Sequence, residues 1–191
     1  MKPSPHYHEK YKICVSGAAE TGHCMPDALE KAKELGREVV RRGAILTTGA
    51  TTGFPLWSAI GAKEEGGISI GFSPAETERE HLEFYKLPVD YFDIIVYTGF
   101  GYSGRNLVLT RASDAIIVGC GRIGTLNEFT IGFEDGKPLG ILTGVGGTAD
   151  MVEDIIAKSH RTGNVIYDSQ PKRLVERILE LIKKDRVIKK E

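Results

Sequence analysis

The stretch Gly119-Cys120-Gly121-Arg122-Ile123-Gly124-Thr125-Leu126-Asn127-Glu128 decides how we interpret this chain. Before it comes the apolar run 115–118, typical of a buried strand, and after it residues 129–133 are expected to form the body of a helix. A glycine-rich turn between strand and helix directs backbone N–H groups outward, where they favour an anion. Glu128 follows within the first turn of the expected helix, although phosphate binding alone needs no carboxylate. The stretch predicts a nucleotide-phosphate site with a carboxylate beside it.

Strand-like and helix-like segments alternate along the rest of the chain. The expected strands are residues 12–16, 44–48, 68–72, 94–97, 115–118, 138–142 and 165–167. The expected helices cover about 26–42, 55–65, 105–112, 129–133 and 149–158, and a last amphipathic helix follows 169. This alternation predicts an α/β class: a Rossmann-like, doubly wound, largely parallel sheet of about seven strands with helices on both faces. We expect residues 1–191 to form one domain, with 1–10 as a loose lead-in.

Glycine-containing loops follow most of the expected strands, and in parallel sheets ligands bind at the carboxyl ends of the strands. Gly17 closes the first strand, and the segment Gly49-Ala50-Thr51-Thr52-Gly53 closes the second. We take Gly17, Gly49, Thr51, Thr52 and Gly53 as candidate ligand contacts. The alternative for the second block is that its glycines only allow close strand–helix packing. The convergence of these loops predicts one shared pocket.

Charge and cysteine content limit the classes of function. The chain has 25 Lys+Arg against 26 Asp+Glu, a net charge of −1, which favours neither nucleic acid nor a membrane surface as partner. The cysteines Cys14, Cys24 and Cys120 are odd in number and lack close spacing, which argues against a disulfide framework and against a zinc site. No ligand cluster suggests a metal. Neither a signal peptide nor an apolar run of about 18 residues is present, so we expect a soluble cytoplasmic protein.

The spacing Gly121-x-x-Gly124-Thr125-x-x-Glu128, with Arg105 upstream, resembles the motif P-G-G-x-G-T-x-x-E of the LOG (Lonely Guy) family of nucleoside-monophosphate phosphoribohydrolases. The phrases at 104–106, 111–115 and 136–138 are similar to a sister branch that includes molybdenum-cofactor carrier proteins. The resemblance covers about residues 12–142. It departs from the LOG motif at Cys120 and Arg122, which stand where the motif has Pro and Gly.

The resemblance implies roles for individual residues. Residues 121–125 (Gly121, Arg122, Ile123, Gly124 and Thr125) would hold a 5′-phosphate, with the Thr125 hydroxyl donating a hydrogen bond. Glu128 would face the ribose and orient water or stabilise positive charge at the anomeric carbon, and Arg105 would position Glu128 or contact the ligand. Arg122 would either obstruct the phosphate or grip it. The family also implies a homodimer and no required cofactor.

Each assignment has an alternative. Thr125-x-x-Glu128 is also the pattern of a capping box, which would only satisfy N–H groups at the helix start. Cys120 is treated as a small packing residue, because no histidine stands near it in the sequence. The leading functional hypothesis is hydrolysis of a nucleoside 5′-monophosphate to free base and ribose 5-phosphate. The second is a non-catalytic carrier or sensor of a nucleotide or phosphorylated pterin-type ligand in the same pocket.

Overall fold

The computed structural model describes residues 10–188, with side chains to residue 184, so the expected lead-in at 1–10 lies almost wholly outside the described residues. Within that range the chain forms one α/β domain built around a parallel sheet. The strands are β1 (Lys12–Ser16), β2 (Ile45–Thr48), β3 (Ser69–Ser73), β4 (Ile94–Tyr97), β5 (Ala115–Val118), β6 (Leu139–Leu142) and β7 (Val165–Asp168). The helices are α1 (Ala28–Arg41), α2 (Phe54–Glu64), α3 (Glu78–Glu83), α4 (Gly101–Ala112), α5 (Ile123–Glu134), the 3₁₀ turn η1 (Gly147–Met151), α6 (Val152–Ser159) and α7 (Pro171–Ile188). The expected Rossmann-like fold is confirmed.

The strand order is β4-β3-β2-β1-β5-β6-β7, and every pairing is parallel. The chain runs outward from β1 to β4 on one side and then returns to place β5 on the other side of β1. The register pairs Ser16 with Val118, so the last residues of β1 and β5 lie side by side. This reversal is the position at which parallel sheets bind ligands, because the loops after the two strands diverge and leave a crevice.

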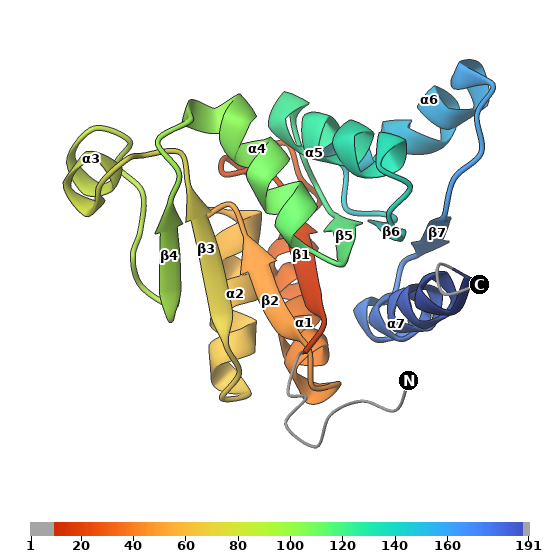
Figure 1. Cartoon of the computed structure of the whole chain (residues 1–191), viewed down its shortest axis with the longest axis horizontal. Coiled ribbons are helices and arrows are strands. Elements are labelled where there is room, and N and C mark those ends of the chain that lie inside the picture. The colour runs from red at the N-terminus through yellow and green to blue at the C-terminus, as the bar shows by residue number, and fades with distance from the viewer. Residues whose placement is uncertain (1–9, 189–191) are drawn as a thin grey trace.

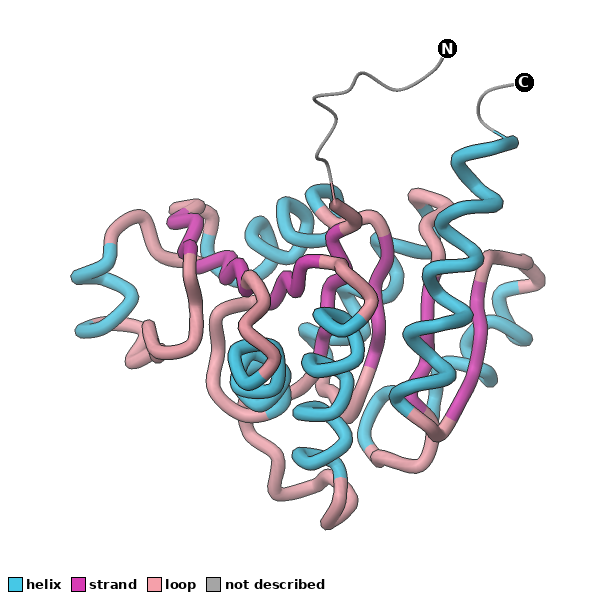
Figure 2. The backbone as a smooth tube through the Cα atoms, turned by 90° about the horizontal axis from the view of Figure 1, so that it is seen from below, coloured by secondary structure: helices cyan, strands magenta, loops and turns pink. Residues whose placement is uncertain are grey.

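Helices cover both faces of the sheet, as Figures 1 and 2 show. Helices α1, α2 and α7 pack together on one face, whereas α4 and α5 pack on the other, next to η1 and α6. Burial on both faces explains why β5 is a continuous apolar run, Ala-Ile-Ile-Val, in which all four residues are buried. The short α3 lies beyond the β4 edge of the sheet (Figure 1). None of the helices among residues 10–188 combines the length and the apolar character that a membrane crossing needs.

Two helices begin earlier than the sequence suggested. Helix α4 starts at Gly101 rather than near Arg105, because Gly101 takes a backbone φ of +63° that turns the chain into the helix. Helix α5 starts at Ile123, so the glycine turn is shorter than expected and Gly124 and Thr125 belong to the first helical turn. The early start of α5 brings its exposed N–H groups close to the end of β5.

Candidate functional site

The crevice between the ends of β1 and β5 contains a cavity of about 320 Å³. This lies at the lower end of the volumes typical of small-molecule sites, which are concave and largely preformed. Residues from four parts of the chain line it: the loop after β1, the loop after β2, helix α4 and the start of α5. They are Gly17, Ala18, Ala19, Glu20, Thr51, Tyr102, Arg105, Asn106, Arg122, Gly124, Thr125 and Glu128.

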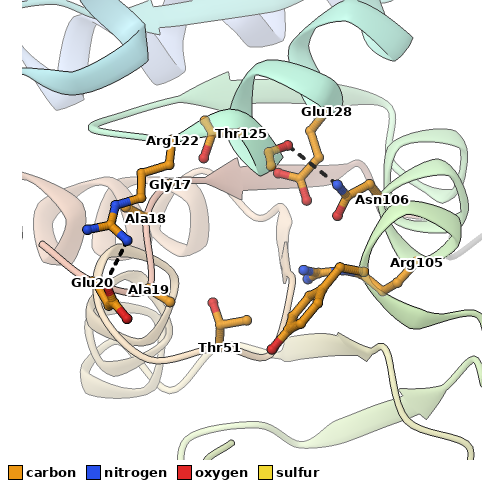
Figure 3. A pocket seen from close by; sticks show the side chains of 12 residues that line it. Gly17, Ala18, Ala19, Glu20, Thr51, Arg105, Asn106, Arg122, Thr125 and Glu128 are labelled. Carbon is orange, nitrogen blue, oxygen red and sulfur yellow. Dashed lines mark hydrogen bonds and ion pairs between the residues drawn. The ribbon is translucent and has the colours of Figure 1, made fainter. Parts of the chain in front are cut away.

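Glu128 points inward from α5 and is buried, with 6% of its surface exposed (Figure 3). One carboxylate oxygen accepts a short hydrogen bond from the hydroxyl of Ser16, the last residue of β1. Burial raises the pKa of Glu128 above its usual 4.5, and this effect outweighs the opposing influence of Arg105 and the Ser16 hydrogen bond. Glu128 is therefore a desolvated carboxyl group held by the neighbouring strand.

The capping-box alternative for Thr125 and Glu128 is wrong. Arg122 is the N-cap residue of α5, it makes no side-chain capping hydrogen bond, and Thr125 stands inside the first turn. The Glu128 carboxylate bonds to Ser16 instead of turning back to its own helix. The first N–H groups of a helix have no partner within the helix, so the start of α5 presents uncapped donors beside the cavity.

Arg105 is the buried cation of the site. It is 6% exposed, and its guanidinium carbon lies 5.8 Å from the centre of the Tyr102 ring. Its Nη1 is 3.5 Å from the carbonyl oxygen of Phe72, and its Nε has no hydrogen-bond partner among the described residues. A buried donor without a partner costs free energy.

Asn106 adds an acceptor next to that donor. Its amide nitrogen donates to the side-chain oxygen of Asn127, at 3.0 Å, and more weakly to the carbonyl of Gly124, at 3.4 Å. These bonds leave the amide oxygen of Asn106 buried and without a partner among the described residues. Two residues that line the cavity, Arg105 and Asn106, therefore each contain a buried polar atom without a partner among the described residues.

An exposed ion pair stands at the opposite side of the cavity. A guanidinium nitrogen of Arg122 lies 2.6 Å from a carboxylate oxygen of Glu20 (Figure 3). The pair joins the loop after β1 to the start of α5. Arg122 lines the cavity, and Glu20 holds its guanidinium group at the rim.

The structure brings some of the predicted residues to the cavity and not others. Gly17, Thr51, Arg105, Arg122, Gly124, Thr125 and Glu128 line it, whereas Gly121, Ile123, Gly49, Thr52 and Gly53 do not. Ile123 is largely exposed, and Thr52 bonds to the carbonyl of Ala19. Gly121 gives room to Thr125, since a Cβ there would lie 2.4 Å from the Cβ of Thr125. Gly53 has a φ of +67°, the left-handed region that suits glycine.

Five lining residues and one supporting residue were not predicted as site residues: Ala18, Ala19, Glu20, Tyr102, Asn106 and, as the support, Ser16. Ser16 carried a usable signal, because it ends a strand whose carboxyl end was expected at the pocket. Asn106 carried one too, since it follows Arg105 in the phrase shared with the carrier branch. Tyr102 and Glu20 gave none, because Tyr102 belongs to the first turn of α4, which the sequence did not predict, and Glu20 belongs to the loop after β1.

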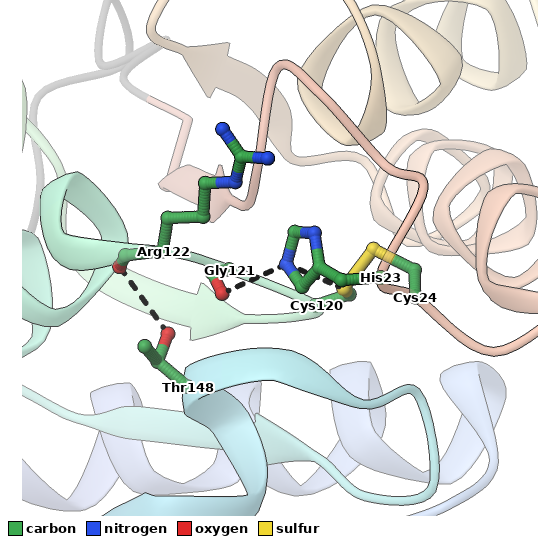
Figure 4. Close-up of a disulfide and its surroundings, with 6 residues drawn as sticks. All are labelled: His23, Cys24, Cys120, Gly121, Arg122 and Thr148. Atoms are coloured by element: carbon green, nitrogen blue, oxygen red, sulfur yellow. Dashed lines mark hydrogen bonds between the residues drawn. A yellow bond between two sulfur atoms is a disulfide. The ribbon is translucent and has the colours of Figure 1, made fainter.

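The prediction about the cysteines is wrong. Cys24 and Cys120 form a disulfide, although 96 residues separate them, because the pairing of β1 with β5 brings the following loops together (Figure 4). Cys120 is therefore not a simple packing residue, and a histidine does accompany it: Nε2 of His23 lies 3.6 Å from its sulfur. Local spacing along the sequence carries no information on such long-range pairs.

The chain matches the family model of the SLOG cluster4 family over residues 10–175. It belongs to this family. The match covers most of the described residues, including the whole cavity, and it is consistent with the LOG-like resemblance of the glycine motif.

This SLOG cluster4 protein is also similar to individual proteins in sequence and in fold. A molybdenum cofactor binding protein from the phototrophic bacterium Rippkaea orientalis is 28% identical, with a TM-score of 0.74 over 94% of this chain and 99% of that one. The Moco carrier protein from Chlamydomonas reinhardtii has the same fold at 24% identity, with a TM-score of 0.75 over 92% and 99% of the two chains. An uncharacterised protein from Archaeoglobus fulgidus is 29% identical over 126 residues, which are 66% of this chain and 78% of that protein.

Proposed function

We propose that this protein binds a phosphorylated small molecule, a nucleotide or a phosphorylated pterin, in the cavity between β1 and β5. The observation that carries the proposal is the uncapped start of α5 at the cavity wall, with Gly124 and Thr125 in its first turn. Partial positive charge at a helix N-terminus and unpaired N–H groups together suit a phosphate. Arg122 adds a guanidinium group at the rim, where it is paired with Glu20.

The opposite wall of the cavity suits a heterocycle. The unpaired Nε of Arg105 is a donor and the unpaired amide oxygen of Asn106 is an acceptor, and both lie at residues that line the cavity. Purine and pterin rings carry the complementary groups along one edge. The ring of Tyr102 and the small side chains of Ala18 and Ala19 supply apolar surface for the ring faces. The similarity to the molybdenum cofactor binding protein from Rippkaea orientalis favours a carrier role for a ligand of this class, a phosphorylated pterin.

A second function, hydrolysis of a nucleoside 5′-monophosphate, is favoured by one specific observation: the inward-facing carboxyl of Glu128. Phosphate binding does not need it. In the reaction, water adds to the anomeric carbon, the bond from that carbon to the base breaks, and the base leaves with a proton. The ionised Glu128 would stabilise the oxocarbenium-like charge or orient the water. Its raised pKa weakens this role at low pH, because a larger fraction of the group is then neutral.

One experiment separates the two functions. Calorimetric titration with a panel of nucleoside monophosphates and phosphorylated pterins measures binding, and chromatography of the same mixtures measures free base. Binding without release of base supports a carrier. Release of base by wild type that is lost in Glu128→Gln supports the hydrolase. Absence of binding to every phosphorylated compound contradicts both.

We also propose that the protein forms a homodimer. Large apolar side chains are exposed on β4 and at the start of α4. Monomeric proteins rarely leave such a group of apolar side chains exposed to solvent. The side chains are Ile94, Val96, Phe100, Tyr102 and Leu107. Sedimentation velocity of wild type and of Phe100→Glu tests the dimer, since a charge at a residue that is 69% exposed should separate the subunits without unfolding them. A wild-type monomer at high micromolar concentration would contradict the proposal.

A further inference from the structure

Three side chains that carry nitrogen or sulfur ligand atoms meet beside the glycine turn, outside the cavity described above (Figure 4). Cys24 and His23 stand in the loop between β1 and α1, and Cys120 stands two residues after the end of β5. Their ligand atoms, two Sγ and one imidazole nitrogen, all lie within 4.8 Å of one another. Nε2 of His23 is 3.6 Å from Sγ of Cys120 and 3.2 Å from the carbonyl oxygen of Gly121.

Backbone hydrogen bonds also join the loop after β1 to two neighbours, the segment after β5 and the loop after β6. The amide of Ala18 donates to the carbonyl of Cys120, at 2.7 Å. On the other side of the cysteine pair, the amide of Met25 donates to the carbonyl of Val145, at 3.0 Å. Neither bond involves a cysteine sulfur, so we expect the backbone to keep the two thiols and the imidazole close to one another when the disulfide is reduced.

We propose that, in the reduced protein, His23, Cys24 and Cys120 bind Zn²⁺. Two thiolates and one imidazole are a donor set that zinc prefers, and bond lengths of about 2.3 Å to sulfur and about 2.0–2.1 Å to nitrogen imply tetrahedral N···S separations of about 3.5 Å. The N···S separation observed between His23 and Cys120 is 3.6 Å. The ligand spacing is therefore already that of a zinc site on one edge of the tetrahedron.

The remaining coordination position is open. Three protein ligands leave the fourth coordination position for water or an anion, as in catalytic zinc sites. His23 is exposed, so the ion can enter from solvent, whereas Cys120 is fully buried. Binding through Nε2 moves the ring proton to Nδ1 and replaces the contact of Nε2 with the Gly121 carbonyl.

Conversion of the disulfide form to the zinc-binding form needs a thiol reductant. A dithiol gives two electrons and two protons to the Cys24–Cys120 disulfide; the S–S bond breaks, two thiols form, and the dithiol becomes a disulfide. Zn²⁺ then displaces the two thiol protons. Cys14 takes no part: it is buried within β1, and burial raises the pKa of its thiol well above the usual value.

Zinc titration of the reduced protein tests the site. The full chain is reduced with a phosphine, freed of reductant without air, and titrated with Zn²⁺ against a chromophoric chelator; Co²⁺ serves as the spectroscopic probe. His6 and His8, which lie outside the described residues, are replaced by alanine in every sample, because paired histidines also bind zinc. The matched control is His160→Asn, which changes an exposed histidine with a left-handed backbone at the end of α6.

We expect one Zn²⁺ per reduced chain and a cobalt–thiolate absorption band. The substitutions His23→Ala and Cys24→Ser each remove a direct ligand, so each should weaken zinc binding by at least about 100-fold. Residues that only hydrogen-bond to a ligand typically change metal affinity by about 10–100-fold. The oxidised protein and chelator-treated samples should show no band, and His160→Asn should bind as the parent does.

Several results would overturn the proposal: no zinc bound by the reduced parent, equal binding by its oxidised form, or unchanged binding in His23→Ala or Cys24→Ser. Cys24→Ser changes only a half-buried loop residue, and circular dichroism shows whether it is folded. If it is unfolded, His23→Ala decides, since this exposed side chain contributes nothing to the core. None of these outcomes depends on a ligand in the cavity, so the zinc site and the proposed function stand or fall separately.

Discussion

The guanidinium group of Arg105 occupies the space that a side chain at Gly49 would fill. A Cβ built at Gly49 would lie 1.6 Å from Nη1 of Arg105. Gly49 was predicted as a ligand contact, but it does not line the cavity; it gives the buried Arg105 its place. A glycine at the end of β2 thus acts on the site through the arginine of α4.

We expect Gly49→Ala to weaken binding of the phosphorylated ligand by about 10–100-fold, because the added methyl group displaces Arg105. A hydrogen bond from this charged side chain to the ligand would contribute about 1.5–3 kcal/mol. Calorimetry measures the affinity. The control is Gly22→Ala, since a Cβ at Gly22 meets no atom within 4 Å. Wild-type affinity in Gly49→Ala would show that Arg105 does not hold the ligand.

The substitution Gly124→Ala should change stability and binding in opposite directions. A Cβ at Gly124 meets no atom within 4 Å, and alanine favours the helix by about 0.5–1 kcal/mol. The same methyl projects from the first turn of α5 at the cavity, where it takes space from the phosphate. Urea denaturation should therefore show a gain, and calorimetry a loss of affinity. A variant that gains stability and keeps full affinity would place the phosphate elsewhere.

Glu128→Gln should stabilise the protein at neutral pH. The pKa of Glu128 is raised by burial, so this group favours the folded state below its unfolded pKa of about 4.5, and that advantage is lost as the pH rises through the higher folded pKa. A glutamine still accepts the Ser16 hydrogen bond but carries no charge to desolvate. The melting temperature of the variant should exceed that of wild type at pH 7 and match it near pH 4. If the variant and the wild type differ in melting temperature by the same amount at both pH values, the raised pKa of Glu128 does not affect stability, and the prediction is wrong.

The glycine motif shows how much of the site the sequence could predict. The apolar run of β5, the turn and Glu128 stand together in the chain, so a local pattern and a family resemblance placed them correctly. The direction of the Glu128 side chain was not predictable, because it depends on Ser16 in another strand. The same reason hid the Cys24–Cys120 pair, which only the order of the strands brings together.

Breaking the rim ion pair should tighten binding. Glu20 holds Arg122 and carries a charge that repels a phosphate. In Glu20→Gln the Arg122 side chain is free to bind the anion, so the affinity for the ligand at low salt should rise. An exposed ion pair contributes up to about 1 kcal/mol, which corresponds to a rise of up to about fivefold. The gain should disappear at high salt because the charges are screened. Glu30→Gln, a change at an exposed acidic residue outside the cavity, is the control. A loss of affinity in Glu20→Gln would mean that Glu20 itself binds the ligand.

The central claim is that the start of α5 holds a phosphate group. The most direct measurement compares the affinity of each nucleoside 5′-monophosphate with that of its own nucleoside, for wild type and for Gly124→Ala. We predict that wild type binds at least one monophosphate far more tightly than the nucleoside, and that Gly124→Ala loses most of this difference. Equal affinity of wild type for nucleoside and monophosphate across the whole panel, or the same difference in both proteins, would contradict the account.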